Sequence, residues 1–389
     1  MILLTVSVAF VRSYQKMLAV DPGFRPDHVL VAGYQLPLEQ YGTGSSAQRF
    51  NREVLDRLAG KPGIVATGMA EVLPATASVP MADYTIEGVR MDSWKMQFAP
   101  CTVSDGDYFR AMGIPLREGR YFTREDKTGA QLVLIVNESM AKHAWPGQDA
   151  VGKRMHLGNP NGGLPWATVV GVVGDTRRSR DELAGDEYYL PTDQPDSLNG
   201  TDAPDNLTNA AGGYIVLRSA LPPDQMEQTL RATVAEVDPM LALKEVRPMV
   251  DALANTEAPR RFNTGLIGAF SLGALLLAVS GIYAVVAFSV TLRVQEIAIR
   301  MALGAERGKI AWMVLAGGVK LAMLGCGLGV AGSVALSRIV SSFLFDVSPT
   351  DPLLYALSAA VMLLLTMAAS ALPAARAAAT EPIGALRAV

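Results

Sequence analysis

Side chains that carry chemistry are scarce in this chain of 389 residues, which has only two cysteines and three histidines. Cys101 lies in a polar region and Cys326 in an apolar run, so we expect no disulfide between them. His28, His143 and His156 have no cysteine or carboxylate at metal-ligand spacing, and we expect them on the surface or in loops. The sequence therefore predicts no metal site and no catalytic site.

Charged residues are also scarce in the C-terminal third of the chain. Residues 262–389 contain eight basic and five acidic residues, a net charge of +3. The other 26 of the 34 basic and 32 of the 37 acidic residues give residues 1–261 a net charge of −6. An acidic, polar portion is therefore joined to an apolar one, and two domains are expected. The overall charge of −3 and the lack of a basic patch argue against a nucleic-acid partner.

The apolar portion predicts three helices that cross a lipid bilayer. Residues 262–292 carry no charge over 31 positions, more than the ~20 that a spanning helix needs. The other predicted spans are residues 310–338 and 352–373. The connection 293–309 and the C-terminal tail are basic, whereas the connection 339–351 is acidic, so the positive-inside rule places the first two in the cytoplasm. The polar portion then lies outside the membrane.

The first 11 residues are apolar but too short to cross a bilayer. A signal peptide is the alternative, but the basic n-region and a convincing cleavage site are missing. We therefore expect residues 1–19 to form a truncated first membrane helix and the exit from it.

Residues 20–258 predict an α+β domain with a β-α-β unit at each end. The expected elements are strand 29–36, helix 47–58 and strand 64–72, then strand 214–218, helix 224–237 and strand 243–246. Residues from about 100 to 200 are expected to form an inserted subdomain, with strands at 132–136 and 167–173. The polar stretch 191–209 is typical of a loop.

Two glycine motifs in the apolar portion resemble nucleotide sites by letter only. The sequence GLGVAG (residues 327–332) lies inside an apolar helix without the preceding strand of a dinucleotide site, and Gly325, Gly329, Ser333 and Ser337 instead predict a groove for helix packing. The sequence GAERGK (residues 304–309) lacks one spacer of a phosphate-binding loop and is followed by Ile310 in place of Ser or Thr. We expect no cofactor and no ATPase site in this chain.

The segment RVQEIAIRMALGA (residues 293–305) predicts a two-faced helix between the first two spans. A helix places Arg293, Glu296, Arg300 and Arg307 on one stripe and Val294, Ile297, Met301 and Ala305 on another. Glu296 precedes Arg300 by four residues, the favourable order for an ion pair on a helix. A basic loop that only fixes topology needs neither feature, so a docking surface is favoured.

This segment resembles the R-x-x-E-I-x-I-R-x-A-L-G-A sequence of the permeases of MacB/FtsX-type ABC transporters. The tail LPAARAAATEPIGALR (residues 372–387) is similar to the closing segment of that family. The outer portion resembles its periplasmic core domain at VDPGF (20–24), YFRAMGIP (108–115), IVNE (135–138), WPG (145–147) and VGVVGD (170–175). The loop FDVSPTDP (345–352) is most like the orphan branch, in which two permease units are fused.

The resemblance implies a MacB-like periplasmic core domain at residues 20–258 and an FtsX-like permease domain at 259–389. It implies a separate cytoplasmic ABC ATPase that grips a coupling helix, and no catalytic residue in this chain. The residues expected in that helix are Arg293, Glu296, Ile297, Arg300, Met301, Leu303 and Gly304. Helix packing is assigned to Gly325, Gly329 and Ser333, and the cytoplasmic tail to Pro373, Arg376 and Arg387.

The implied function is that of a permease subunit in the inner membrane of a bacterium, for efflux or envelope transport. Its further expected partners are a second permease unit, as a homodimer or a fused twin half, and a periplasmic adaptor or envelope protein. The alternative is an FtsX-like membrane scaffold or signal transmitter that regulates an envelope partner such as a cell-wall hydrolase.

Overall fold

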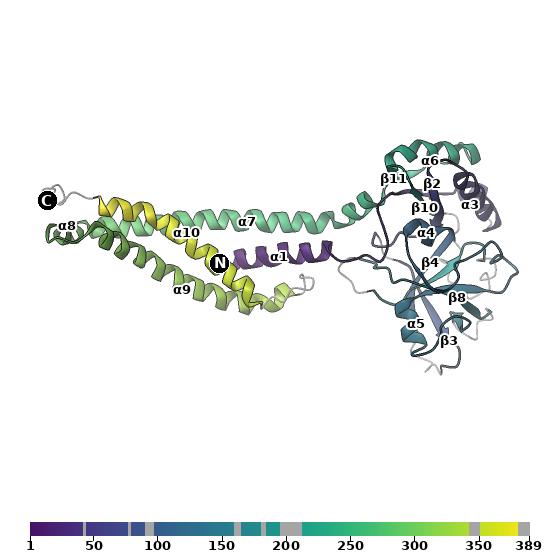
Figure 1. Ribbon diagram of the computed structural model, residues 1–389, viewed down its shortest axis with the longest axis horizontal. Coiled ribbons are helices and arrows are strands. Elements are labelled where there is room, and N and C mark those ends of the chain that lie inside the picture. The colour runs from purple at the N-terminus through teal and green to yellow at the C-terminus, as the bar shows by residue number, and fades with distance from the viewer. Residues whose placement is uncertain are drawn as a thin grey trace. The chain divides into compact units, whose positions relative to one another are not determined.

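The computed structural model describes residues 1–41, 44–76, 79–89, 97–158, 165–179, 184–194, 212–341 and 351–379 (Figure 1). The chain forms two compact units. The helical unit comprises Met1–Ala19 and Ala258–Val389, and the α/β unit comprises Val20–Glu257. Most of the loop expected at 191–209 and residues 345–350 of the FDVSPTDP loop lie outside the described residues.

One lobe of the α/β unit is a four-stranded antiparallel sheet with the strand order β11-β1-β10-β2. Its strands are β1 (Val29–Gln35), β2 (Ile64–Ala70), β10 (Gly212–Ser219) and β11 (Lys244–Pro248). The helix α3 (Gly44–Ala59), preceded by the short α2 (Leu38–Tyr41), joins β1 to β2, and α6 (Pro223–Val237) joins β10 to β11. Both expected β-α-β sequences of elements are therefore present, interleaved as in a ferredoxin-like fold.

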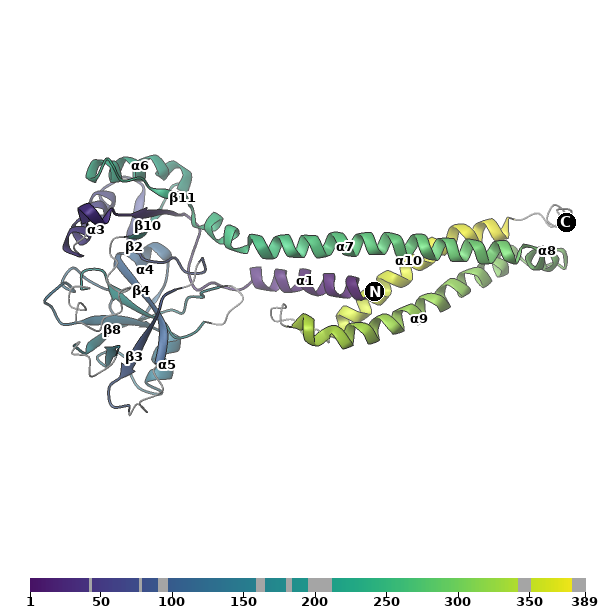
Figure 2. The same cartoon turned by 180° about the vertical axis from the view of Figure 1, so that it is seen from behind.

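Both faces of this sheet are covered, because successive side chains of its strands enter different cores. Leu30 and Ala32 pack in the core beneath α3 and α6, which lie on the same face of the sheet (Figure 2). Val29 and Val31 pack in a second core with α4 (Tyr108–Met112) and with the first turns of α7, at Met249–Leu253.

The chain between β2 and β10 forms a ring of six paired strands, a closed barrel. In order of pairing these are β4 (Gln97–Gly106), β3 (Met81–Ile86), β7 (Arg154–Leu157), β8 (Ala167–Val173), β6 (Val133–Asn137) and β9 (Tyr188–Pro191), and β9 pairs again with β4. The strand β5 (Leu116–Gly119) pairs with β8, and α5 (Glu138–Ala144) follows β6. Alternate residues such as Leu134 and Val136 fill the interior.

The barrel differs in two respects from the expectation for the inserted subdomain. Its first strand begins at Met81, before the expected interval of about 100–200, because the β3–β4 hairpin supplies two of the six barrel strands. His156 is fully buried on β7, where its ring lies 5.3 Å from that of Trp166. The expectation of a surface or loop position was therefore wrong for this histidine.

The helical unit contains three helices that are long and apolar enough to cross a membrane, as the sequence predicts. Within the described residues these spans are Met249–Leu292, Arg307–Leu336 and Pro352–Ala378. They belong to α7 (Met249–Leu292), α9 (Arg307–Ser341) and α10 (Pro352–Ala378), and α8 (Val294–Ala302) lies between α7 and α9. The apolar N-terminal stretch is part of a 17-residue helix, α1 (Ile2–Leu18).

Candidate functional site

The helix α8 ends in a glycine cap that follows from its sequence. Gly304 has a φ of 92°, the left-handed conformation that glycine adopts without a steric penalty. The Gly304 N–H donates to Met301 O and the Ala305 N–H to Arg300 O, both at 3.0 Å. These two bonds form a Schellman motif, which satisfies carbonyl groups that the helix end would leave unpaired. The Leu-Gly-Ala sequence therefore fixes where the helix stops.

The apolar stripe predicted for α8 faces the spans. Ile297 is 1% exposed and packs with Ile310 of α9 and Ala377 of α10. Met301 and Ala305 are half-buried at the edge of this cluster, together with residues of α7 and α9. The helix is thereby joined to all three long helices of the unit.

The charged stripe of α8 is exposed. Arg300 forms an ion pair with Glu296 one turn earlier, and about half of each side chain is accessible to solvent. Arg293 lies at the N-terminal end of the helix and is also exposed. Two apolar side chains share this accessibility, since Ile299 is 50% exposed and Leu303 is 84% exposed. The accessible side of α8 thus combines charged with apolar groups.

A cavity of about 260 Å³ lies next to α8 inside the helical unit. It is lined by Arg293 and Ile297 and by residues of α7 and α9, among them Gly317 and Gly318. A Cβ atom at Gly318 would lie 2.5 Å from Ser370 Oγ of α10, so α9 and α10 approach closely at this glycine.

The residues predicted for helix packing lie in different settings. A Cβ atom at Gly329 would lie 2.6 Å from that of Met1, and one at Gly332 would lie 2.7 Å from Ile2 Cδ1, so α1 packs on α9 here. Ser333 is buried and donates to Gly329 O within its own helix at 2.8 Å. A Cβ atom at Gly325 would meet no described atom within 4 Å, so there is room for a side chain at this position.

The helix α1 is held in the helical unit by polar contacts as well. Ser271 Oγ of α7 donates to Leu3 O at 2.8 Å. Arg12 forms an ion pair of 2.7 Å with Asp351, whose other carboxylate oxygen accepts from Leu353 N and caps α10. The α1 helix therefore contacts α7, α9 and the start of α10.

The predicted tail residues are only partly described. The helix α10 continues through Pro373, which is buried, to Ala378, so it ends later than the expected residue 373. Arg376 Nη1 donates to Tyr283 OH of α7 at 3.1 Å. Arg387 lies outside the described residues.

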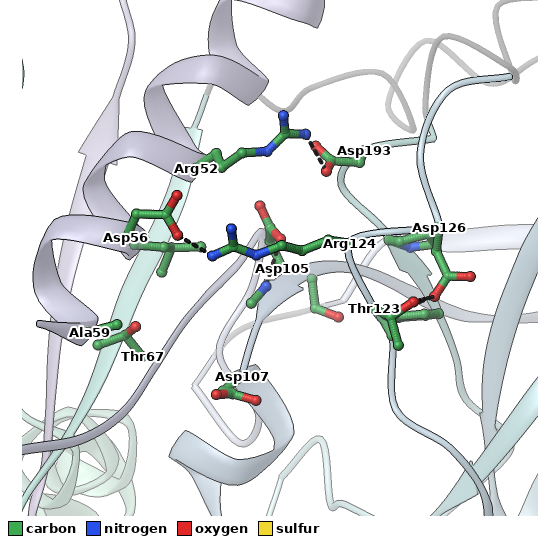
Figure 3. Close-up of a pocket in the computed structure, with 15 residues that line it drawn as sticks. Arg52, Asp56, Ala59, Thr67, Asp105, Asp107, Thr123, Arg124, Asp126 and Asp193 are labelled. Atoms are coloured by element: carbon green, nitrogen blue, oxygen red, sulfur yellow. Dashed lines mark hydrogen bonds and ion pairs between the residues drawn. The ribbon is translucent and has the colours of Figure 1, made fainter. Parts of the chain in front are cut away.

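The α/β unit contains a polar cavity of about 220 Å³ between α3 and the barrel (Figure 3). Two ion pairs cross it: Arg52 contacts Asp193 at 2.6 Å, and Asp56 contacts Arg124. One helical turn earlier on α3, Gln48 Nε2 donates to Thr192 O at 3.2 Å. Residues 48, 52 and 56 thus form one stripe of α3 that faces the barrel.

Asp105 lies between the two ion pairs in Figure 3, at the end of β4. Burial raises the pKa of its carboxyl to about 6, and the neighbouring Asp193 adds to the increase. The Gly106 N–H, which donates to Asp105 Oδ1 at 2.6 Å, lowers this pKa, as do Arg52 and Arg124. Local sequence patterns do not reveal this cavity, because its residues come from segments up to 141 positions apart.

An α/β unit and three helices of membrane-spanning length, with a capped two-faced helix between two of them, define a multi-span membrane protein. Residues 3–235 match the family described as MacB-like periplasmic core domain, and residues 268–382 match FtsX-like permease C-terminal. The chain belongs to the MacB/FtsX-type family of ABC transporter permeases. Membership of this family implies a cytoplasmic ATPase as a partner.

The chain is similar to several named relatives. It is 26% identical over 294 residues to the uncharacterized ABC transporter permease YvrN of Bacillus subtilis (strain 168). The matched region covers 73% of this chain and 68% of the relative. It is 27% identical over 284 residues to the macrolide export ATP-binding/permease protein MacB of Chromobacterium violaceum. The matched region covers 72% of this chain and 42% of the relative. The chain therefore spans less than half the length of this MacB relative.

Among solved structures, the chain is similar to the periplasmic region of MacB from Actinobacillus actinomycetemcomitans. The identity is 15%, the TM-score is 0.40, and the match covers 62% of this chain and 98% of that one. The extracellular domain of the noncanonic ABC-type transporter YknZ from Gram-positive bacteria matches with 14% identity and a TM-score of 0.35, over 56% of this chain and 100% of that one.

Proposed function

We propose that this chain is a permease subunit that couples ATP hydrolysis by a separate cytoplasmic ATPase to movement of its α/β unit. The observation that carries the proposal is the construction of α8. This helix has a glycine cap, a buried stripe joined to the spans and an accessible stripe with Arg293, Glu296 and Arg300. An ATPase that contacts the accessible stripe would therefore move a short helix that packs directly on the spans.

The packing around α8 offers a route for that displacement. Ile297 contacts a cluster that includes Val290 of α7, Ile310 of α9 and Ala377 of α10. Ile297 packs directly on these side chains, so a shift of α8 would act on the three helices through this cluster, even though a cavity lies beside it. The helix α7 begins at Met249, which is buried in a core of the α/β unit. One continuous helix therefore has its first turn in one unit and its last turn beside α8.

We place α8 in the cytoplasm and the α/β unit in the periplasm of a bacterial inner membrane. The basic connection that contains α8 supports this orientation. Within the described part of the predicted spans, the only charged residues are Lys320, whose side chain is exposed, and Arg338 at the end of the second span. Spans so poor in charge favour cargo handled on the outer side, in efflux or envelope transport, over cargo passed through a polar pore.

The complete transporter in this proposal has further components. A second permease unit, either a second copy or a fused twin half, would supply the other set of spans. The large apolar side chains of α7 support this, since Leu272, Leu277 and Phe288 are each more than half exposed and would be covered by lipid or by another span. A periplasmic adaptor or envelope protein would act on the α/β unit.

The role of α8 is tested with charge reversals in the reconstituted complex of this chain and its ATPase. The variants are Glu296→Arg, Arg300→Glu and the double reversal, which restores an ion pair on α8 with the opposite polarity. Because the proposal assigns each charge to contact with the ATPase, we expect all three variants to lower transport-coupled ATP hydrolysis. A loss of one charge-assisted contact corresponds to roughly a tenfold weaker effect of the permease on the ATPase.

The double reversal distinguishes docking from helix stability. If the pair only stabilised α8, the double reversal would restore coupling to the level of the unchanged chain. The matched control is Glu306→Gln, because Glu306 pairs with Lys309 just outside α8 and is also exposed. If the reversed variants assemble normally and keep normal transport-coupled ATP hydrolysis, α8 does not dock the ATPase through these charges.

A further inference from the structure

Two helices of the helical unit, α1 and α7, lie side by side and run in opposite directions (Figures 1 and 2). Their contacts give the register. Ser271 Oγ of α7 donates to Leu3 O of α1 at 2.8 Å, and Arg260 Nη1 of α7 donates to Met17 Sδ of α1 at 3.7 Å. The residue numbers therefore rise along α1 as they fall along α7, and the C-terminal half of α1 faces residues 260–264.

A cavity of about 200 Å³ opens between the two helices at this end. Besides Met17 and Arg260, it is lined by Phe10, Ser13 and Tyr14 of α1 and by Asn263 and Thr264 of α7. Among the described residues, Arg260 is the only charged one in the lining. Arg260 and Asn263 are exposed, whereas Ser13 and Met17 are buried. The cavity is therefore accessible from outside beside a guanidinium group.

The cavity lies where the apolar parts of several helices end. Residues 262–292 of α7 carry no charge, and the apolar start of α1 ends at Arg12. Arg12 pairs with Asp351 at 2.7 Å, and Asp351 caps α10, whose residues 352–373 are also uncharged. These boundaries mark the level of a membrane surface, where lipid headgroups lie. In the orientation proposed above, this surface faces the periplasm.

The charge at this level is positive. The two facing segments, residues 10–17 and 258–264, contain four basic residues and no acidic one. These are Arg12, Lys16, Arg260 and Arg261. Only Arg12 shares its charge with the cap of α10. An anion at the cavity would therefore meet a favourable field.

We propose that this cavity binds the headgroup of an anionic phospholipid through its phosphate. A guanidinium group matches two phosphate oxygens with two parallel N–H donors, as Arg260 can provide. The amide of Asn263 and the hydroxyl of Thr264 are donors for further oxygens. Phe10 and Met17 supply apolar walls for the glycerol part. The volume is several times the roughly 30 Å³ of one water molecule in the liquid, which suits a headgroup.

Other ligand classes fit the cavity less well. A cation would meet Arg260. A small soluble anion would leave the apolar walls in contact with water. Toward the centre of the spans, α1 and α7 come together, because Ser271 contacts Leu3 and a Cβ atom at Gly268 would lie 4.0 Å from Ser7 Oγ. The acyl chains of the bound lipid therefore stay in the bilayer, outside the cavity.

An arginine at the end of a span can also extend to water without binding a lipid, so the site needs a matched control. Arg261 provides it. It is the next residue of α7, is exposed like Arg260, and is not part of the cavity lining. General attraction between basic residues and anionic lipid would involve both arginines equally. A built site would depend on Arg260 alone.

The test uses the full chain purified in a neutral detergent. The probes are phosphatidylglycerol, phosphatidylcholine with the same acyl chains, and inorganic phosphate. Native mass spectrometry counts bound lipid, and thermal unfolding reports the stabilisation that binding causes. We expect phosphatidylglycerol to bind saturably and to raise the unfolding temperature more than phosphatidylcholine does, and inorganic phosphate to have no effect. The measurement needs no ATPase, so its outcome is independent of the role of α8.

The variant Arg260→Gln removes the charge that lines the cavity. We expect its affinity for phosphatidylglycerol to be roughly tenfold lower, and that of Arg261→Gln to be unchanged. Equal losses in the two variants would overturn the proposal, as would equal binding of the two lipids. Stabilisation by inorganic phosphate equal to that by phosphatidylglycerol would overturn the lipid as the source of the anion.

A second variant keeps the proposal testable if Arg260→Gln does not fold. Asn263→Asp preserves the size of an exposed side chain and places a carboxylate in the lining. Because like charges repel, we expect this variant also to bind phosphatidylglycerol more weakly than the unchanged chain. Unchanged affinity of a folded Asn263→Asp variant would overturn the proposed site.

Discussion

At the residue scale, the surroundings of the Asp105 carboxyl raise its pKa. Burial and the neighbouring Asp193 bring the pKa of this carboxyl from its usual value of 3.8 to about 6. The folded state therefore binds a proton more tightly than the unfolded state, and its stability falls as the pH rises from about 4 through about 6. The charged form remains less favourable at neutral pH than an uncharged side chain of the same shape.

We therefore expect Asp105→Asn to be more stable than the unchanged chain at neutral pH. The gain is about 1–2 kcal/mol, after allowance for solvent screening of a half-buried group, and it disappears at pH values below about 4. Chemical denaturation at a series of pH values measures it. Glu53→Gln, which removes an exposed paired carboxylate, serves as the control. If the difference in unfolding free energy between Asp105→Asn and the unchanged chain were the same at every pH, the Asp105 charge would not be the cause of that difference.

Contacts between residues that are close in the sequence could be predicted from it, and contacts between residues that are far apart in the sequence could not. The Leu-Gly-Ala sequence at the end of α8 leads directly to a left-handed glycine and a helix cap. The ion pair of Glu296 with Arg300 follows from their spacing of one turn. The partners of Arg52 and Asp56, by contrast, are Asp193 and Arg124, which the chain brings close only when the barrel forms.

At the element scale, the helix α9 uses different glycines for different neighbours. Gly318 lies against Ser370 of α10, and Gly329 lies against α1. The four-residue repeat of small residues includes Gly329, where an added Cβ would meet Met1, and also Gly325, where an added Cβ would meet no described atom within 4 Å. A repeat of small side chains shows where a helix can approach, and the tilt of the neighbouring helix determines where it does.

The contact between α9 and α10 is tested by Gly318→Leu. Its Cβ atom would lie 2.5 Å from Ser370 Oγ, so the two helices must separate or Ser370 must move. We expect a loss of about 1–3 kcal/mol in stability, which lowers the unfolding temperature by roughly 2–8 °C. The neighbouring Gly317→Leu is the matched control, because a Cβ atom there meets no described atom within 4 Å. Equal effects of the two substitutions would rule out close packing at Gly318.

At the scale of the whole molecule, local patterns predicted the elements but not the way in which the α/β unit closes. The three spans were evident because each is a long uncharged stretch of consecutive residues. The two β-α-β sequences were evident from alternation and helical periodicity. The barrel was not, because its closure depends on the parallel pairing of β4 with β9, for example Cys101 with Tyr188, across a long separation in the chain.

The helix α7 has residues in both units. Its first turns are buried in the α/β unit, with Met249 fully buried, and its last residue is Leu292, immediately before α8. An ATPase contact at α8 is therefore the point at which chemical energy would enter the chain. The central claim is that such a contact exists.

A photo-crosslinking amino acid at Leu303 tests this claim most directly, in the full chain produced together with its native partners. Leu303 is 84% exposed next to the α8 cap, whereas the control position Leu353 is 62% exposed in the first turn of α10, at the opposite end of the spans. We expect Leu303 to yield a crosslink to an ABC ATPase, identified by mass spectrometry, and Leu353 to yield none. An assembled complex without any ATPase crosslink from Leu303, or with equal crosslinks from both positions, would contradict the coupling role of α8.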